Sequence, residues 1–339
     1  MGGGVEQVHR RLAAQFARDG HEVGFFVMNG DRVPGWPTTP GAGNGLGALA
    51  LSCRRLRRLI RQGVTHLVAA KEQANLCAWL ASRGTKCQVI YSRHATLECT
   101  GQRAGPRLLG LLYSLYLYGG GRAVAVSKPL ADALSRRLLW RRERLHDCPN
   151  AVIGDELLEL AKQPPPCPLP DAYLLAVGRL SPEKGFDLLL DAYALASRQV
   201  VLPTLLIVGD GPQANALNLQ AQRLGIAAQV RFTGYLSNPY PLFRGARLFV
   251  LSSRHEGMPT ALIEALALRV PVLATDCQTG PRELLDDGRL GVLVPPDDSQ
   301  ALAEGLLHGL QTSVPVSDAS VRRFHGSEAV QAYYRVWNL

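Results

Sequence analysis

Short apolar runs alternate with longer segments of helical periodicity along almost the whole chain. This alternation favours βαβ units and parallel sheets. The expected strands are 22–28, 65–69, 88–91, 123–126, 173–177, 204–208, 230–233, 248–251, 272–274 and 291–294. The expected helices include 5–18, 49–61, 72–82, 107–118, 129–139, 187–196 and 321–337. The pattern therefore predicts an α/β protein with doubly wound parallel sheets.

Length and a proline-rich segment predict two domains. The chain has 339 residues, of which 47% are hydrophobic, and this is enough to form two domain cores. A stiff segment rich in proline, 164–170, lies near the middle and is typical of a linker. We expect a first domain at residues 1–163, a second at 171–318 and a C-terminal helical segment at 319–339.

Two glutamates eight positions apart mark the most informative part of the chain. Glu256 follows the apolar run 248–251, so it lies in the loop after an expected strand, whereas Glu264 lies in a helical pattern that begins at Pro259. Helical rise plus the loop places the two carboxylates roughly 10 Å apart. Backbone N–H groups of the segment 257–260 form a helix N-terminus between them, where anions bind. Sugar hydroxyls, a diphosphate and ribose hydroxyls would fit this site, which is the outline of a nucleotide sugar.

The sequence around these glutamates resembles a known family. Glu256 and Glu264 match the E-x7-E motif of retaining glycosyltransferases with the GT-B fold, and their surroundings look like the "group 1" branch, family GT4. Three further motifs occur in the order that the family uses, namely VGRLSPEKG at 177–185, IVGDGP at 207–212 and GVLVPP at 291–296. The resemblance is detailed over residues 173–298 and looser at 2–6, 20–23 and 92–94.

The family's fold is implied by this resemblance. It consists of two Rossmann-like, doubly wound parallel-sheet domains with an interdomain cleft. The first domain would bind the acceptor and the second the nucleotide sugar, and the C-terminal helix would cross back to the first domain. In such sheets ligands bind at the carboxyl ends of the strands.

The resemblance also implies roles for individual residues. Arg179 and Lys184 would bind the donor diphosphate, where fixed cations stabilise the charge that the leaving group gains. Glu256 and His94 would act at the reacting centre as catalytic residues. Glu256 would orient the hydroxyls of the transferred sugar, and His94 would hydrogen-bond the sugar or carry positive charge. Glu264 would bind the ribose.

The backbone near the donor is assigned by the same resemblance. Gly257, Met258, Pro259 and Thr260 would contact the donor, and Gly3 and Gly4 would let the backbone approach its phosphates. The turn 209–212 would shape the cleft without chemistry of its own. The structural alternatives are ordinary loop cations at Arg179 and Lys184, a structural histidine at His94 and a helix-surface glutamate at Glu264.

The reaction that the resemblance implies is transfer from an α-linked nucleotide donor to a hydroxyl acceptor with an α-linked product. The departing phosphate would accept the acceptor's proton during front-side attack. Because the sequence contains no D-x-D triplet, we expect no divalent metal and no cofactor besides the nucleotide-sugar co-substrate. Likeness to bacterial enzymes of polysaccharide or lipopolysaccharide synthesis favours a UDP-sugar over a GDP-sugar, and a lipid-linked or envelope saccharide as acceptor.

A second hypothesis is a non-catalytic binding or scaffold protein with the same fold. The family begins with a strand before its glycine-rich loop, whereas here Met1 directly precedes the glycines 2–4. We expect the first domain to lack that strand and the protein to have weak activity. Restoring an upstream strand should then raise turnover. A nicotinamide-dependent enzyme is disfavoured because no G-x-G-x-x-G follows a first strand.

Positive charge is concentrated in the first half of the chain. Residues 1–163 contain 23 Lys and Arg against 12 Asp and Glu, whereas the net charge of the whole chain is +9. Basic residues alternate with Leu, Ile and Trp at 54–61 and 136–142, which suits an anionic membrane surface or a solvated helix face. We expect no nucleic-acid partner, since no binding signature accompanies the charge.

Targeting signals and cysteines indicate the compartment. No apolar run approaches the ~20 residues needed to span a bilayer, and glycines and Glu6 follow Met1 where a signal peptide would be apolar. The seven cysteines include no C-x-x-C pair and are typical of reduced thiols. We expect a cytoplasmic protein that contacts the inner face of the membrane peripherally.

Overall fold

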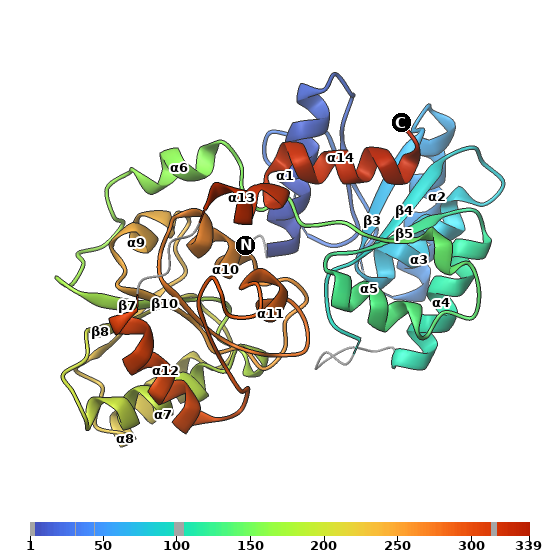
Figure 1. The fold of residues 1–339 in the computed structure, drawn as a ribbon. Coiled ribbons are helices and arrows are strands. Elements are labelled where there is room, and N and C mark those ends of the chain that lie inside the picture. The colour runs from blue at the N-terminus through green and yellow to red at the C-terminus, as the bar shows by residue number, and fades with distance from the viewer. Residues whose placement is uncertain (1–3, 31, 44, 98–104, 313–316) are drawn as a thin grey trace. The chain divides into compact units, whose positions relative to one another are not determined.

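The structure, a computed structural model, describes residues 4–30, 32–43, 45–97, 105–312 and 317–339. Every strand pair in these ranges is parallel, which confirms the expected α/β class. The chain forms two compact units (Figure 1). The first comprises residues 1–151 and 326–339, and the second residues 152–325.

A six-stranded parallel sheet of order β12-β11-β10-β7-β8-β9 forms the centre of the second unit. Its strands are β7 (Tyr173–Val177), β8 (Thr204–Val208), β9 (Val230–Gly234), β10 (Leu248–Leu251), β11 (Val272–Thr275) and β12 (Val292–Val294). All residues of β10 and β11 are buried. Because successive side chains of a strand point to opposite faces, both faces of the sheet are covered there.

Helices surround this sheet. They are α6 (Glu156–Ala161), α7 (Phe186–Ser197), α8 (Ala214–Arg223), α9 (Tyr240–Gly245), α10 (Thr260–Ala267), α11 (Pro281–Leu284), α12 (Ser299–Gln311) and α13 (Asp318–Val321), with the short 3₁₀ helices η2 (Pro182–Lys184) and η3 (Arg322–Phe324). α7 and α12 pack side by side and share the apolar core with β7, β8 and β11.

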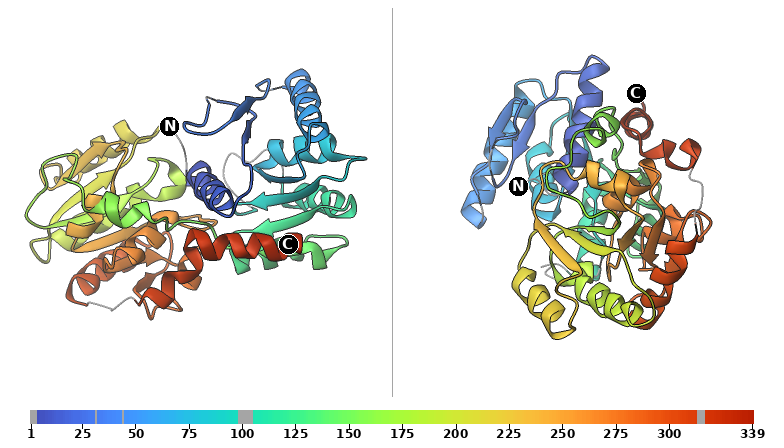
Figure 2. Two further views of the ribbon diagram at one scale, coloured as in Figure 1. Left: turned by 90° about the horizontal axis from the view of Figure 1, so that it is seen from above. Right: turned by 90° about the vertical axis from the view of Figure 1, so that its left-hand side faces the viewer.

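The first unit contains two separate parallel sheets. β3 (His66–Ala70), β4 (Gln88–Arg93), β5 (Arg122–Ala125) and β6 (Leu145–Asp147) form one in this order. β1 (Phe25–Val27) and β2 (Thr38–Pro40) form a pair that stands apart from it (Figure 2).

The helices of the first unit come from both ends of the chain. They are α1 (Gly4–Arg18), α2 (Leu46–Arg61), α3 (Glu72–Ser82), α4 (Pro106–Tyr118), α5 (Lys128–Ser135), the 3₁₀ helix η1 (Arg142–Arg144) and α14 (Gly326–Trp337). α14 packs against α1, where the Tyr334 hydroxyl donates to Asp19 Oδ2 at 2.8 Å and the ring meets Phe16 edge-on.

The division between the units falls at residue 151, before the proline-rich segment that the sequence suggested. Val152 and Ile153 donate backbone hydrogen bonds to the Phe324 carbonyl. Farther on, Asn238 Nδ2 donates to the Leu160 carbonyl at the end of α6, at 3.0 Å. Residues 152–170 therefore belong with the second unit, because their hydrogen-bond partners lie there.

Some elements differ from the pattern-based expectation. The expected helix 321–337 is interrupted at His325, which is extended and forms a parallel bridge with Ile153. The expected strand 22–28 is shorter, and the expected helix 129–139 ends at Ser135. β2 and β6 were not expected, because three-residue strands with polar side chains leave no apolar run.

Candidate functional site

The loops after β7 and β10 meet at one edge of the sheet in the second unit. β7 and β10 are neighbouring parallel strands, so their carboxyl ends lie together. β8 and β9 extend the sheet beyond β7, and β11 and β12 extend it beyond β10. The strand order therefore reverses between β7 and β10, and ligands of open α/β sheets bind at such a switch point.

Lys184 and Glu256 form an ion pair at this edge. Lys184 Nζ lies 2.5 Å from Glu256 Oε1, and Ser253 Oγ donates to the same oxygen at 2.7 Å. Only 8% of Glu256 is exposed. Burial of a carboxylate is costly unless the group is paired and hydrogen-bonded, and the Lys184 ammonium and the Ser253 hydroxyl provide both kinds of partner.

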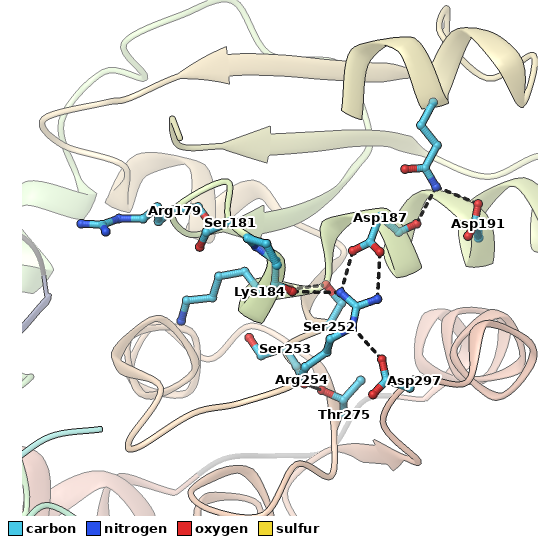
Figure 3. Close-up of polar contacts among 12 residues, drawn as sticks. Arg179, Ser181, Lys184, Asp187, Asp191, Ser252, Ser253, Arg254, Thr275 and Asp297 are labelled. Carbon is cyan, nitrogen blue, oxygen red and sulfur yellow. Dashed lines mark hydrogen bonds and ion pairs between the residues drawn. The ribbon is translucent and has the colours of Figure 1, made fainter. Parts of the chain in front are cut away.

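Arg179 lies in the same loop as Lys184 and is exposed. Figure 3 shows that both side chains extend from this loop toward the same side. Two neighbouring cations of this kind can bind the oxygens of one phosphate group through charge-assisted hydrogen bonds.

Arg254 ties three loops together next to the ion pair. Its Nη1 and Nη2 donate to the two carboxylate oxygens of Asp187 at 2.8 Å each, and its Nε donates to Asp297 Oδ1 at 2.6 Å (Figure 3). Nη1 also donates to the Pro182 carbonyl at 2.9 Å, and the Arg254 backbone N–H donates to the Glu183 carbonyl at 2.8 Å. We call Arg254, Asp187 and Asp297 the arginine clamp.

Charge strengthens this clamp. Burial alone would raise the pKa of Asp187, but hydrogen bonds and charge from Arg254 outweigh it and hold that pKa below its usual value. In return, the hydrogen bonds to Asp187 are the largest cause of a raised pKa at Arg254. The paired, two-pronged geometry fixes the orientation of both side chains as well as their distance.

Glycines allow the backbones of these loops to approach one another. Gly185 has a φ of 63°, and a Cβ there would lie 2.1 Å from the Ser252 carbonyl oxygen. Gly209, after β8, has a φ of 141°, and a Cβ would lie 1.8 Å from the Gly178 carbonyl oxygen. No other residue type fits either position without moving a backbone segment.

Glu264 lies on α10 with 7% of its surface exposed. The hydroxyl of buried Tyr240, at the start of α9, donates to Glu264 Oε1 at 3.0 Å. Glu264 is therefore not a helix-surface residue. The Tyr240 hydroxyl holds one oxygen of the Glu264 carboxylate in place.

The segment 257–260 leads into α10, which begins at Thr260, one residue after the expected Pro259. No side chain caps this helix. Thr279, in the loop after β11, donates its hydroxyl to the Glu256 carbonyl, and Gly280, with a φ of 97°, lies against the Pro259 ring. The loop after β11 thus supports the segment that carries the helix N-terminus.

His94 and Gly4 belong to the first unit, where His94 follows β4 and Gly4 begins α1. Gly3 lies outside the described residues. His94 Nε2 lies 2.8 Å from Ser92 Oγ, and its ring centroid lies 5.1 Å from that of His9 on α1. The roles of His94 and Gly4 toward a donor stay predictions.

Burial is the largest cause that holds the pKa of His94 well below its usual value, and the charges of His9, Lys71 and Arg93 lower it further. A hydrogen bond with Asn150 acts in the opposite direction. Neutral imidazole still donates and accepts hydrogen bonds. Of the two roles considered for His94, the lowered pKa favours hydrogen bonding over positive charge.

His9 was not indicated by the sequence. Its Nδ1 lies 2.8 Å from the Val5 carbonyl oxygen, so the ring carries its proton on Nδ1 and Nε2 is an acceptor. Among the described residues, nothing donates to this buried Nε2. Burial is also the largest cause of a lowered pKa at His9.

The structure joins some of the expected site residues and adds others. It brings Lys184 together with Glu256 and places Arg179 and Glu264 on the same unit. Sequence reasoning missed the polar residues that hold them, namely Ser253, Arg254, Asp187, Asp297, Tyr240 and Thr279. A signal existed for some of these, because polar residues directly after buried parallel strands lie at the ligand-binding edge.

Two family models match the chain. "Glycosyltransferase Family 4" matches residues 2–154, and "Glycosyl transferases group 1" matches residues 159–313. An uncharacterized glycosyltransferase of Haemophilus influenzae is 24% identical over 318 residues, which are 90% of this chain and 86% of that protein.

A second relative is the N-acetylgalactosamine-N,N'-diacetylbacillosaminyl-diphospho-undecaprenol 4-alpha-N-acetylgalactosaminyltransferase of Campylobacter jejuni. It is 34% identical over 138 residues, which are 41% of this chain and 37% of that protein. The chain thus matches little more than a third of that relative's length.

The solved structure of Anabaena HepE in complex with UDP and glucose superposes with a TM-score of 0.79, at 21% identity and with 99% of this chain and 96% of that one covered. At this identity the likeness establishes the fold. The chain has the GT-B fold and belongs to the family 4 glycosyltransferases, in their group 1 branch.

Proposed function

We propose that the chain is a retaining glycosyltransferase that moves a sugar from a nucleotide donor, UDP-linked in preference to GDP-linked, to a hydroxyl group. The product would be α-linked. The observation that carries this proposal is the ion pair of Lys184 with Glu256 at the switch point of the second unit's sheet.

The pair supplies a cation for the diphosphate, Lys184, and a carboxylate that accepts hydrogen bonds from sugar hydroxyls, Glu256. When the donor binds, the ammonium of Lys184 turns to the diphosphate, and sugar hydroxyls replace it as donors to Glu256. Arg179 adds a second cation. As the glycosidic bond breaks, the diphosphate gains negative charge, and cations already in place stabilise this charge without reorganisation.

The other half of the donor would lie toward Glu264. Ribose hydroxyls would donate to the Glu264 carboxylate, which the Tyr240 hydroxyl holds in place through Oε1. The N–H groups at 257–260 would face the diphosphate between the two glutamates.

The acceptor in this proposal is a lipid-linked or envelope saccharide. Two similar proteins support this choice of acceptor. The Campylobacter relative is named for a diphospho-undecaprenol saccharide, and a solved neighbour is a lipopolysaccharide outer core galactosyltransferase. HepE with UDP supports the choice of nucleotide. The six described cysteines are free thiols, as is usual in the cytoplasm, where we place the enzyme.

Donor choice is tested by thermal shift with a panel of UDP- and GDP-sugars. A ligand at 100 times its dissociation constant should stabilise the protein by about 2.7 kcal/mol. We expect a UDP-sugar to give the largest shift. Lys184→Met should abolish this shift, whereas the matched variant Lys162→Met, in the exposed pair with Glu159 on α6, should keep it.

Turnover is then measured as release of UDP from the stabilising donor. Glu256→Gln should lower kcat by roughly 10²-fold, the usual effect of losing one group that acts in the transition state. Donor binding without any turnover by the wild-type chain would support the non-catalytic alternative instead.

Transfer without a metal is part of the proposal. Within the described ranges, no three His, Cys, Asp or Glu residues are grouped so that they could hold a metal ion. We expect EDTA to leave turnover unchanged. Collapse of turnover in EDTA with recovery in magnesium would contradict this expectation.

A further inference from the structure

An apolar surface rimmed by arginines lies on the first unit, over α4 and the segment after α5. Its large side chains are partly exposed: Leu108 by 49%, Leu111 by 41%, Tyr118 by 71%, Leu139 by 61% and Trp140 by 39%. With the half-buried Leu115, we call these residues the α4 face.

Helical spacing places the four α4 members in one stripe. Positions 108, 111, 115 and 118 follow intervals of three, four and three residues, which bring side chains onto one side of a helix. The opposite side of α4 is buried through Leu109, Tyr113, Tyr116 and Leu117. The stripe is thus a second apolar face, additional to the one that packs in the core.

The segment 137–140 extends this stripe sideways. It packs directly on α4, because Trp140 Nε1 donates to the Ser114 carbonyl at 3.1 Å and the Leu139 N–H donates to Ser114 Oγ at 2.9 Å. A Cβ at Gly110 would lie 2.4 Å from the Arg137 carbonyl oxygen. The Tyr118 and Trp140 rings lie 6.2 Å apart. The two segments therefore present one continuous, preformed surface.

Charge around the α4 face is mostly positive. Residues 105–144 contain eight Lys and Arg and two acidic residues, Asp132 and Glu143, and Glu143 pairs with Arg141. Arg107, Arg136, Arg141 and Arg142 are exposed. Leu, Trp and Tyr at the level of the headgroups, with arginines beside them, form the pattern of proteins that lie on an anionic bilayer.

The other basic segment, 54–61 on α2, contains no large exposed apolar side chain, and the exposed leucines of this helix, Leu46 and Leu51, precede the segment. Its exposed side chains from Arg54 to Arg61 are arginines, while Leu56 and Ile60 face the core. Arg55 donates to the carbonyls of Pro40 and Gly41 at 3.1 and 2.7 Å, so it also has a structural contact. Of the two alternatives given for the basic segments, a membrane surface or a solvated helix face, this segment fits the solvated helix face.

We propose that the α4 face is the part of the chain that docks on an anionic bilayer, with its leucines and aromatic rings at the headgroup level. This inference rests on the proposed function, since a lipid-linked acceptor is reached at the membrane surface. No helix in the described residues is long and apolar enough to cross a membrane, and lying on the surface needs none.

The test is co-sedimentation with phosphatidylcholine vesicles, with and without phosphatidylglycerol as the anionic lipid. We expect binding that requires phosphatidylglycerol and weakens with salt, because salt screens the arginines. The double variant L108Q/L111Q should bind at least tenfold more weakly. Both side chains are exposed, so this variant should keep its melting temperature.

Two matched controls separate the α4 face from general effects. L219Q removes an exposed leucine from the second unit, where Leu219 is 58% exposed, and R54Q/R58Q removes two charges from α2. Both should bind vesicles like the wild type. Loss of binding in R54Q/R58Q with unchanged binding in L108Q/L111Q would overturn the proposal.

Two further readouts complete the test. Brominated lipid should quench the fluorescence of Trp140, and W140F should lose this quenching. A wild-type dimer that L108Q/L111Q dissociates, with no vesicle binding by either, would show that the face binds a second copy and would also overturn the proposal. UDP release from a soluble donor should be the same in L108Q/L111Q and wild type, so vesicle binding and glycosyl transfer can fail independently.

Discussion

At the scale of single residues, the arginine clamp decides where the ion pair of the site lies. Arg254 touches the loop of Lys184 through Pro182 and Glu183, and it lies two positions before Glu256. It does not need to touch the donor to affect the reaction. We therefore regard Arg254 as a positioning residue.

Replacing Arg254 by lysine should lower kcat/KM by roughly tenfold or more although the charge is kept. An ammonium cannot reproduce the two parallel bonds to Asp187, and hydrogen bonds to charged groups contribute about 1.5–3 kcal/mol each. Donor titrations of UDP release measure the effect. If positioning is the role, kcat should fall more than KM rises.

Arg282→Lys is the matched control. Arg282 pairs with Asp276 near the same sheet edge but is largely exposed, and exposed ion pairs contribute only about 0–1 kcal/mol. Equal losses in both variants would indicate a general charge effect and would contradict positioning by the arginine clamp.

At the scale of elements, the turns after the strands place the site. The turn after β8 presses on the loop after β7 through Gly209 and Gly178, so its shape reaches the loop that carries Arg179. The sequence predicted a tight turn there, and the contact gives the reason for its glycine.

Gly209→Ala should destabilise the protein by more than backbone strain alone. A positive φ costs a non-glycine residue about 1–2 kcal/mol, and here the new Cβ would also lie 1.8 Å from a carbonyl oxygen. Urea unfolding measures the stability, and thermal shift with the donor measures whether the loop still binds it.

Gly225→Ala provides the comparison. Gly225 also has a positive φ, 73°, but a Cβ there would meet nothing within 4 Å. We expect about 1 kcal/mol of destabilisation from strain alone and an unchanged donor shift. If Gly209→Ala and Gly225→Ala were equally destabilised and had the same donor shift, the loop after β7 would have moved to accommodate the new Cβ without loss of stability.

Elements also show where sequence patterns stop being informative. The strands of the second unit could be predicted because burial on both faces requires unbroken apolar runs, as in Leu248–Leu251. β2 and β6 could not, since three-residue strands depend on a neighbour to pair with. The interruption at His325 depends on its bridge to Ile153, which periodicity within one segment does not show.

At the scale of the whole molecule, two buried histidines should make the stability of the fold depend on pH. The pKa values of His9 and His94 in the first unit are lowered, chiefly by burial. The folded state therefore binds fewer protons than the unfolded state below the usual histidine pKa of about 6.5. Stability should fall as pH drops below that value and should be regained above it.

The histidine pair can be tested by urea unfolding between about pH 5 and 7.5, the range in which histidine titrates. We expect the free energy of unfolding to rise with pH in the wild type. His9→Phe keeps a ring beside His94 and should reduce this slope, whereas His308→Asn, at an exposed position on α12, should not. A wild-type stability independent of pH would contradict the buried, neutral pair.

The sequence by itself determined the fold class and the family, and it predicted the charged residues of the candidate site. Apolar runs and the spacing of Glu256 and Glu264 are local properties, so they can be read without coordinates. Only the tertiary structure decided that Lys184 pairs with Glu256, that Arg254 joins three loops, that Tyr240 holds Glu264, and that α4 carries a second apolar face. These contacts join residues from separate segments, and which segments meet depends on the order and register of strands in the sheet.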